Sequence, residues 1–170
     1  MALVDVVIEG DQIKRLPQKN RDELIDTLRA KNHAGLVLFS RGTTGRPKAI
    51  LHDFTVFLKR FKIPRPTLLT INFLLFDHIG GLNTLLHKLL NKRTVIALKS
   101  GSVEDVINAC DYNHVEVLPT TPTFLRMILM SGLIPDSMPK SLRLITYGTE
   151  RMDQPTLDAL CELLPEVDFR

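Results

Sequence analysis

Two glycines, three hydroxyl side chains and a lysine stand within the nine residues Ser40-Arg41-Gly42-Thr43-Thr44-Gly45-Arg46-Pro47-Lys48. Glycine allows positive φ, so that several backbone N–H groups can approach one anion, and the hydroxyls of Ser40, Thr43 and Thr44 add donors. Lys48 supplies a positive charge on a long side chain. The combination predicts a loop that holds phosphate groups; the structural alternative is an ordinary Gly/Thr-rich hairpin turn.

The order of these residues differs from the Walker phosphate loop, in which the lysine directly follows a glycine and opens a helix. Here Pro47 stands directly before Lys48, and apolar, strand-like runs at 36–39 and 48–51 lie on both sides. Proline has no N–H and disfavours helix at the residue before it. We therefore expect a loop that joins strand to strand as a hairpin.

The run from Ser40 to Lys48 resembles the phosphate-loop signature Ser/Thr-x-Gly-Thr-Thr-Gly-x-Pro-Lys of the adenylate-forming superfamily, which includes acyl-CoA synthetases, adenylation domains of peptide synthetases and luciferases. Arg41 departs from the family, which usually has a small residue there, and its guanidinium either attracts phosphate or crowds the loop. The resemblance implies that the nucleotide is bound by Ser40, Gly42, Thr43, Thr44, Gly45 and Lys48.

A second candidate group, Phe76-Asp77-His78-Ile79-Gly80, lies where a strand-like run passes into a helical pattern. It resembles the Phe-His-x-x-Gly motif of acyl-CoA synthetases, which implies that His78 lies near the acyl pocket and the site of adenylate formation. Without that resemblance, His78 is a helix cap or a surface group.

Asp77 has two readings. In amino-acid-activating members an aspartate at this place holds the substrate ammonium; otherwise Asp77 is the N-cap of a helix that begins near Ile79, which we favour. A buried carboxylate without a cationic substrate is costly, so the apolar neighbours Leu74 and Leu75 favour an uncharged acyl substrate.

A third group, Tyr147-Gly148-Thr149-Glu150, follows the strand-like run 142–146. It resembles the family's Gly-Gly-Glu-type turn, which implies that Gly148, Thr149 and Glu150 border the acyl group and the nucleotide. The family's separate Tyr-Gly-x-Thr-Glu motif has one residue more, and we expect that motif beyond Arg170. Ligands also collect at the carboxyl ends of strands in α/β sheets, whatever the family.

From residue 34 onward, strand-like runs alternate with helical periodicity, which predicts an α/β fold with a mixed or parallel sheet flanked by helices. Caps are expected at Ser102, Asp153 and either Thr120 or Thr121. The expected strands are 35–39, 48–52, 67–72, 94–98, 115–119 and 142–147, and residues 166–170 read as the opening of another. The expected helices are 21–30, 54–61, 79–91, 103–113, 123–131 and 154–164.

Composition narrows the class of protein. Of 170 residues 44% are apolar, which is enough for one sizeable core. The charged residues are scattered and give a net charge of +3, which does not suggest nucleic-acid binding.

Cys110 and Cys161 lie far apart in helical patterns, so we expect buried free thiols in a reducing cytosol. No run reaches the roughly 18 apolar residues of a membrane span. We expect a cytoplasmic protein without a metal site, since the remaining histidines share no ligand spacing: His33, His52, His87 and His114.

The resemblance covers residues 34–170 and implies part of the large N-terminal domain of an adenylate-forming enzyme, with residues 1–33 as a lead-in carrying one helix. It implies a ligase that uses ATP and magnesium to convert a small carboxylic acid to an acyl-adenylate and then passes the acyl group to a thiol such as CoA. The expected partner is the C-terminal domain of the parent protein, without which we expect no turnover of ATP. The alternatives are an amino-acid-activating adenylation domain and a non-catalytic nucleotide-binding module.

Overall fold

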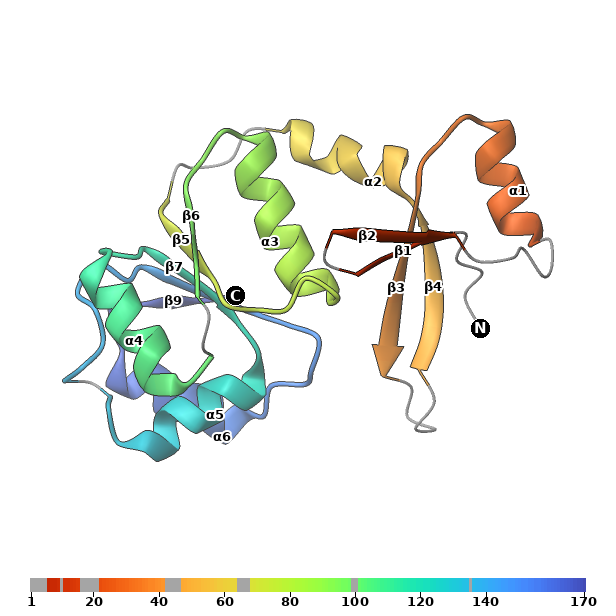
Figure 1. Ribbon diagram of the computed structural model, residues 1–170. Helices are drawn as coiled ribbons and strands as arrows, with labels where there is room; N and C mark the ends of the chain where they lie inside the picture. Colours follow the sequence, from red (N-terminus) through yellow and green to blue (C-terminus); the bar gives the residue numbers. More distant parts are fainter. Residues whose placement is uncertain are drawn as a thin grey trace. The chain divides into compact units, whose positions relative to one another are not determined.

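The computed structural model describes residues 6–9, 11–15, 22–41, 47–63, 68–98, 101–134 and 136–170. The contacts within the chain divide it into two compact units, Met1–Lys62 and Ile63–Arg170. The first unit contains two antiparallel hairpins and the second a parallel sheet with helices on both faces (Figure 1). The α/β class predicted from the sequence is confirmed.

The first unit is built from two hairpins and three helical segments. The hairpin of β1 and β2 is an addition to the sequence prediction, although the dipeptide Gly10-Asp11 is a local turn signal. The bounds are β1 (Val6–Glu9), β2 (Gln12–Arg15), α1 (Glu23–Ala30), β3 (Gly35–Arg41), β4 (Pro47–Asp53), α2 (Phe54–Lys59) and the 3₁₀ helix η1 (Arg60–Lys62).

A hydrogen-bonded pair closes the base of the β3–β4 hairpin. The imidazole Nδ1 of His33 lies 2.7 Å from a carboxylate oxygen of Asp53, whose other oxygen accepts from the Val56 N–H at 2.9 Å. The bonds with His33 and Val56 lower the pKa of Asp53. The same carboxylate therefore fixes the hairpin and caps α2.

The second unit is a five-stranded sheet in the order β6-β5-β7-β8-β9, in which every neighbouring pair is parallel. The strands are β5 (Thr70–Asn72), β6 (Val95–Ala97), β7 (Val117–Thr120), β8 (Leu144–Tyr147) and β9 (Asp168–Phe169). The helices are α3 (Ile79–Leu90), α4 (Val103–Tyr112), α5 (Pro122–Ser131) and α6 (Gln154–Leu163).

The core of this unit lies on one face of the sheet. Ile71, Leu118 and Ile145, one from each central strand, are at most 1% exposed and pack with the apolar sides of α4, α5 and α6. The helix α3 lies on the other side of the strands (Figure 1). Right-handed crossovers produce this division, because the chain steps from β5 to β6 in one direction and from β6 to β7 in the other.

The predicted caps are confirmed at three helices. The side chains of Ser102, Thr121 and Asp153 accept hydrogen bonds from the backbone N–H of Asp105, Phe124 and Thr156, at 3.1, 3.2 and 3.0 Å. All predicted strands and helices from residue 21 onward are present, with ends that differ by a few residues. The described residues include no helix that is both long and apolar enough to cross a bilayer.

Two predictions were wrong. Asp77 does not cap α3, because the chain still turns there: His78 N–H bonds to Leu75 O, and the helical bonds begin from His78 O to Leu82 N–H. Cys161 is exposed, whereas Cys110 is buried as predicted. Cys161 follows the fully buried Leu160, and one step along a helix rotates a side chain by about 100°, here toward solvent.

The two free thiols should react at very different rates. Burial raises the pKa of the Cys110 thiol to about 12, so almost no thiolate forms there at pH 8. We expect Ellman's reagent to modify one thiol quickly in the native protein and both after unfolding in guanidinium. A Cys161→Ser variant should lose the fast phase, and a fast phase that persists in this variant would contradict the burial of Cys110.

Candidate functional site

The strand order places a crevice at the carboxyl end of the sheet. β5 pairs with β6 on one side and with β7 on the other, so the chain leaves these strands toward opposite faces. Helices that depart in opposite directions leave a gap at such a reversal, and ligands bind there in open α/β sheets. A cavity of about 370 Å³ occupies this place, lined by the last residues of β7 and β8 and by residues that follow β5, β7 and β8 in the chain.

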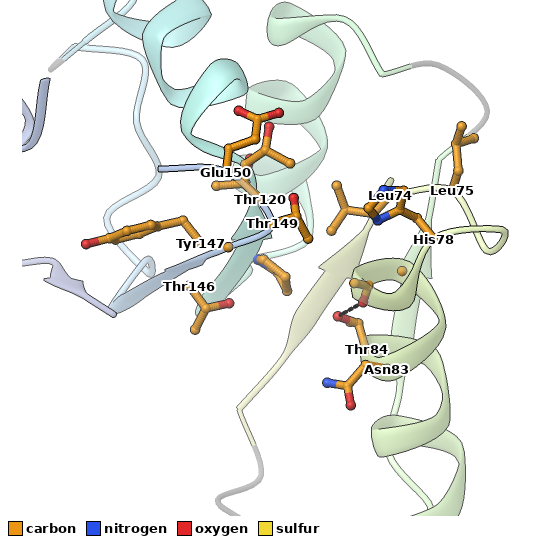
Figure 2. Close-up of a pocket in the computed structure, with 15 residues that line it drawn as sticks. Leu74, Leu75, His78, Asn83, Thr84, Thr120, Thr146, Tyr147, Thr149 and Glu150 are labelled. Carbon is orange, nitrogen blue, oxygen red and sulfur yellow. Dashed lines mark hydrogen bonds between the residues drawn. The ribbon is translucent and has the colours of Figure 1, made fainter. Parts of the chain in front are cut away.

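One wall of the cavity is formed by α3 and the loop before it (Figure 2). A Cβ atom at Gly81 would lie 2.3 Å from the carbonyl oxygen of Leu75 and 2.6 Å from that of Leu74. The buried Asn72, at the end of β5, donates from Nδ2 to the Gly81 carbonyl at 3.0 Å. The close approach and this bond together fix the first turn of α3, where His78 begins the helix.

The opposite wall is the turn after β8, from Tyr147 to Glu150 (Figure 2). Thr149 has a φ of 69°, a left-handed conformation that is unfavourable for a β-branched residue. The Glu150 carboxylate accepts hydrogen bonds from the backbone N–H and the hydroxyl of Thr123, at 3.0 and 2.5 Å. The strained turn is thus tied to the start of α5.

Thr120 lies between the two walls at the end of β7. Its side chain is 4% exposed, and its hydroxyl has no hydrogen-bond partner among the described residues. A buried hydroxyl without a partner costs about 1–3 kcal/mol, and such groups occur where a ligand or water completes the bonding. The cavity therefore offers a polar group that the described part of the protein does not itself satisfy.

A second cavity, of about 550 Å³, is lined by α3 and by residues of β5, β7 and β8. It shares Asn83, Thr84, Pro119 and Thr146 with the first cavity and extends along α3 to Lys88. The buried Lys88 ammonium donates to the Leu68 carbonyl at 2.7 Å, and burial lowers the pKa of this lysine. This bond anchors the last turns of α3 to the residues that lead into β5.

The structure brings the predicted residues of the second and third groups together. His78, Gly148, Thr149 and Glu150 all line the first cavity. His78 is exposed and its ring makes no capping bond to α3, so the imidazole is available to a ligand. Asp77 is exposed and is not among the residues that line the cavity.

The predicted phosphate loop lies in the first unit and joins two antiparallel strands, as the sequence indicated. Ser40 and Lys48 are paired directly across β3 and β4, and the Lys48 side chain is exposed. The remaining predicted residues of the loop lie outside the described residues: Gly42, Thr43, Thr44 and Gly45.

Several residues of the site were not predicted. Asn72 ends an apolar strand-like run, and a polar residue at a strand end is a signal that was present in the sequence. Gly81 is the second of two adjacent glycines, but only the coordinates show which one meets backbone atoms. Thr120 was considered only as a helix cap, a role that Thr121 fills.

A parallel sheet with its cavity at the strand reversal, preceded by a glycine-rich hairpin, is the arrangement of an α/β nucleotide-binding enzyme domain. The family model described as "AMP-binding enzyme" matches residues 3–169. The chain therefore belongs to the AMP-binding enzyme family, and the resemblance drawn from the phosphate loop is confirmed. Among functionally curated proteins, none matches this sequence.

Solved structures share the fold. The luciferase-like enzyme of the mealworm Zophobas morio is 22% identical with a TM-score of 0.64, over 78% of this chain and 32% of that one. The amide bond synthetase McbA of Marinactinospora thermotolerans is 22% identical with a TM-score of 0.63, over 75% and 27%. O-succinylbenzoate coenzyme A synthetase of Bacillus subtilis, solved with ATP and magnesium, is 23% identical with a TM-score of 0.59, over 75% and 27%. This chain thus spans about a third or less of their length.

Substituting the two adjacent glycines should have different effects on stability. Gly81→Ala forces a methyl group against two carbonyl oxygens and should lower the free energy of unfolding by about 2 kcal/mol or more. Gly80→Ala meets only the Leu74 side chain at 3.4 Å, and alanine is favoured in a helix by about 1 kcal/mol, so no loss is expected. Urea unfolding measures both; equal losses would contradict the close approach at Gly81.

Proposed function

We propose that the chain is part of an ATP-dependent ligase that converts a carboxylic acid to an acyl-adenylate and passes the acyl group to a thiol such as CoA. The observation that carries the proposal is the convergence of His78, Gly148, Thr149 and Glu150 on one cavity at the strand reversal. These residues come from separate motifs, far apart in the sequence. Membership of the AMP-binding family supports the use of a nucleotide.

In the proposed reaction a carboxylate oxygen of the acid attacks the α-phosphorus of ATP, a new O–P bond forms, and pyrophosphate leaves. A thiolate then attacks the acyl carbon, and AMP leaves with the bonding pair. Such chemistry requires positioning and charge neutralisation more than a protein nucleophile. The pyrophosphate part would be held by Ser40, Gly42, Thr43, Thr44, Gly45 and Lys48, and His78 would border the acyl carboxylate.

Magnesium would enter the site with the nucleotide. The described residues contain no group of three or more His, Cys, Asp or Glu side chains placed to bind a metal ion. Magnesium keeps several waters and binds mainly through substrate phosphates with one or two carboxylates, so a dedicated protein cage is not required. Bound in this way, the ion would neutralise the charge of the leaving pyrophosphate.

The cavity favours an acid with an uncharged body over an amino acid. Among the described residues that line it, Glu150 is the one carboxylate, and an oxygen of this group already accepts two bonds from Thr123. Asp77, the residue that would hold a substrate ammonium, is not among the lining residues. The apolar side chains Leu74 and Leu75 line the same wall as His78. An ammonium group would have to compete with Thr123 and Arg126 for the Glu150 carboxylate, and burying an incompletely paired cation is costly.

The acceptor and the extent of the natural protein are part of the same proposal. One structure that shares the fold is titled an amide bond synthetase and another a coenzyme A synthetase, so both amine and thiol acceptors occur on this fold. We assign a thiol because the sequence motifs match acyl-CoA synthetases. We also propose that the natural protein is longer, with a C-terminal domain that completes the site.

ATP binding should depend on Lys48. A hydrogen bond to a charged group contributes about 1.5–3 kcal/mol, so Lys48→Ala should weaken the binding of MgATP at least tenfold. Isothermal titration calorimetry of the wild-type chain and the variant measures this. The exposed Lys59 on α2 supplies the matched control, and Lys59→Ala should bind as the wild type does. Equal affinity of the wild type and Lys48→Ala would contradict a phosphate-holding role.

Substrate class can be tested with non-hydrolysable acyl-adenylate analogues. We expect benzoyl- or octanoyl-sulfamoyladenosine to bind at least tenfold more tightly than the phenylalanyl analogue, because the ammonium of the latter meets only a carboxylate that already bonds to Thr123. Calorimetry with the whole chain gives the three affinities. Preference for the phenylalanyl analogue would support the amino-acid-activating alternative, and binding of MgATP without any of the three would support a non-catalytic nucleotide-binding module.

A further inference from the structure

We propose that Glu150 and Arg126 are positioning residues: Glu150 completes the cap of α5 and so holds the strained turn that forms one wall of the cavity. In this role the Glu150 carboxylate shapes the site and does not itself contact the substrate. The proposal deepens the proposed function and rests on it only for the identity of the ligand.

The start of α5 needs a hydrogen-bond acceptor from outside the helix. Pro122, the first residue of α5, has no N–H, and Thr121 accepts from Phe124 N–H through its side chain and from Leu125 N–H through its carbonyl. The Thr123 N–H remains, and Glu150 accepts from it. All three N–H groups of the first turn are satisfied only when Glu150 is in place.

Electrostatics favours the same arrangement. A carboxylate at a helix N-terminus is stabilised by the partial positive charge of the unpaired N–H groups. The bond from the Thr123 N–H is charge-assisted, which makes it stronger than a neutral one. Glu150 is 42% exposed, so its more distant ion pair with Arg126, at 3.8 Å, adds little.

Arg126 links the turn to the next helix. Its guanidinium donates to the Thr123 hydroxyl at 3.1 Å and to the Asp153 carboxylate at 2.9 Å. Asp153 caps α6, and hydrogen bonds from Thr156 and then from Arg126 lower the pKa of this carboxyl. Both ends of the segment from Glu150 to Asp153 are therefore held against α5.

The hydrogen bonds of Glu150 and Arg126 are needed because the turn from Tyr147 to Glu150 is strained. A β-branched residue at a φ of 69° costs free energy that the surrounding contacts must offset. A Cβ at the neighbouring Gly148 would meet no atom within 4 Å, so packing does not hold the turn on that side. Without the bonds of Glu150, the turn would relax toward an ordinary conformation and the Tyr147–Glu150 wall would move.

In the whole chain, two amide protons report on the cap of α5, and one tyrosine reports on the position of the Tyr147–Glu150 wall. Hydrogen exchange of the Thr123 amide should accelerate at least tenfold in Glu150→Ala, whereas the Phe124 amide, capped by Thr121, should not change. The sequence has no tryptophan and two tyrosines, of which Tyr112 is 85% exposed and is not among the residues that line the cavity. In a Tyr112→Phe background, fluorescence therefore reports on Tyr147 in the wall.

Conservative variants separate positioning from direct contact. Glu150→Gln keeps an acceptor oxygen and should retain Thr123 protection and the Tyr147 signal. Arg151→Gln removes a charge next to Glu150 without changing any of the hydrogen bonds described above, and should also match the wild type. Arg126→Ala should change the Tyr147 signal in the same direction as Glu150→Ala. Thr149→Gly removes the strain of the turn. In that background, the change that Glu150→Ala causes in the Tyr147 fluorescence should fall by at least half. An equal effect in both backgrounds overturns the proposal.

Binding completes the test. With the sulfamoyladenosine that the wild type binds best, Kd should rise at least fivefold in Glu150→Ala and stay within twofold in Glu150→Gln. A loss in Glu150→Gln as large as in Glu150→Ala overturns the proposal, because the carboxylate charge would then contact the ligand. If the wild type binds none of the analogues, the proposed function fails, and the amide and fluorescence measurements still decide whether Glu150 positions the turn.

Discussion

Parallel pairing of β5 with two neighbours is the constraint that determines the architecture of the second unit. Parallel strands cannot be joined by a tight turn, so each connection becomes a helix that crosses one face of the sheet. Since the chain moves first to β6 and then back past β5 to β7, α3 and the helices α4 to α6 lie on opposite faces. The ends of β5 and β7 cannot be covered by the same segment, and the cavity lies between the two segments that leave these strands.

Each wall of the cavity is then fixed by a side chain that bonds to backbone. Asn72 reaches the carbonyl of Gly81 on one side, and Glu150 reaches the N–H of Thr123 on the other. Hydrogen bonds are directional, so these contacts set the position of a turn more narrowly than apolar packing does. Apolar packing serves a different purpose here: Ile71, Leu118 and Ile145 hold the strands against the helices beneath the site.

The sequence revealed the alternation of strands and helices, because apolar runs and helical periodicity are local signals. It also revealed three motifs: residues of two of them line one cavity of the second unit, and the third lies between the paired strands β3 and β4 of the first unit. The contacts that shape the walls depend on residues that are distant in sequence, such as Glu150 and Thr123, and local patterns do not show them. The wrong cap at Asp77 had a local cause: the His78 N–H bonds to the Leu75 carbonyl, and the N-cap position of α3 falls at His78.

The close packing at Gly81 limits where this cavity can vary. Any side chain there would displace the backbone of the loop before α3, and the hydrogen bonds of Glu150 constrain the other wall in a similar way. Asn83 and Thr146, which border both cavities, carry neither constraint. Divergence between proteins with this fold would therefore be tolerated first at such positions, so that a new substrate preference can arise by exchange of one or two side chains while the backbone of the site stays the same.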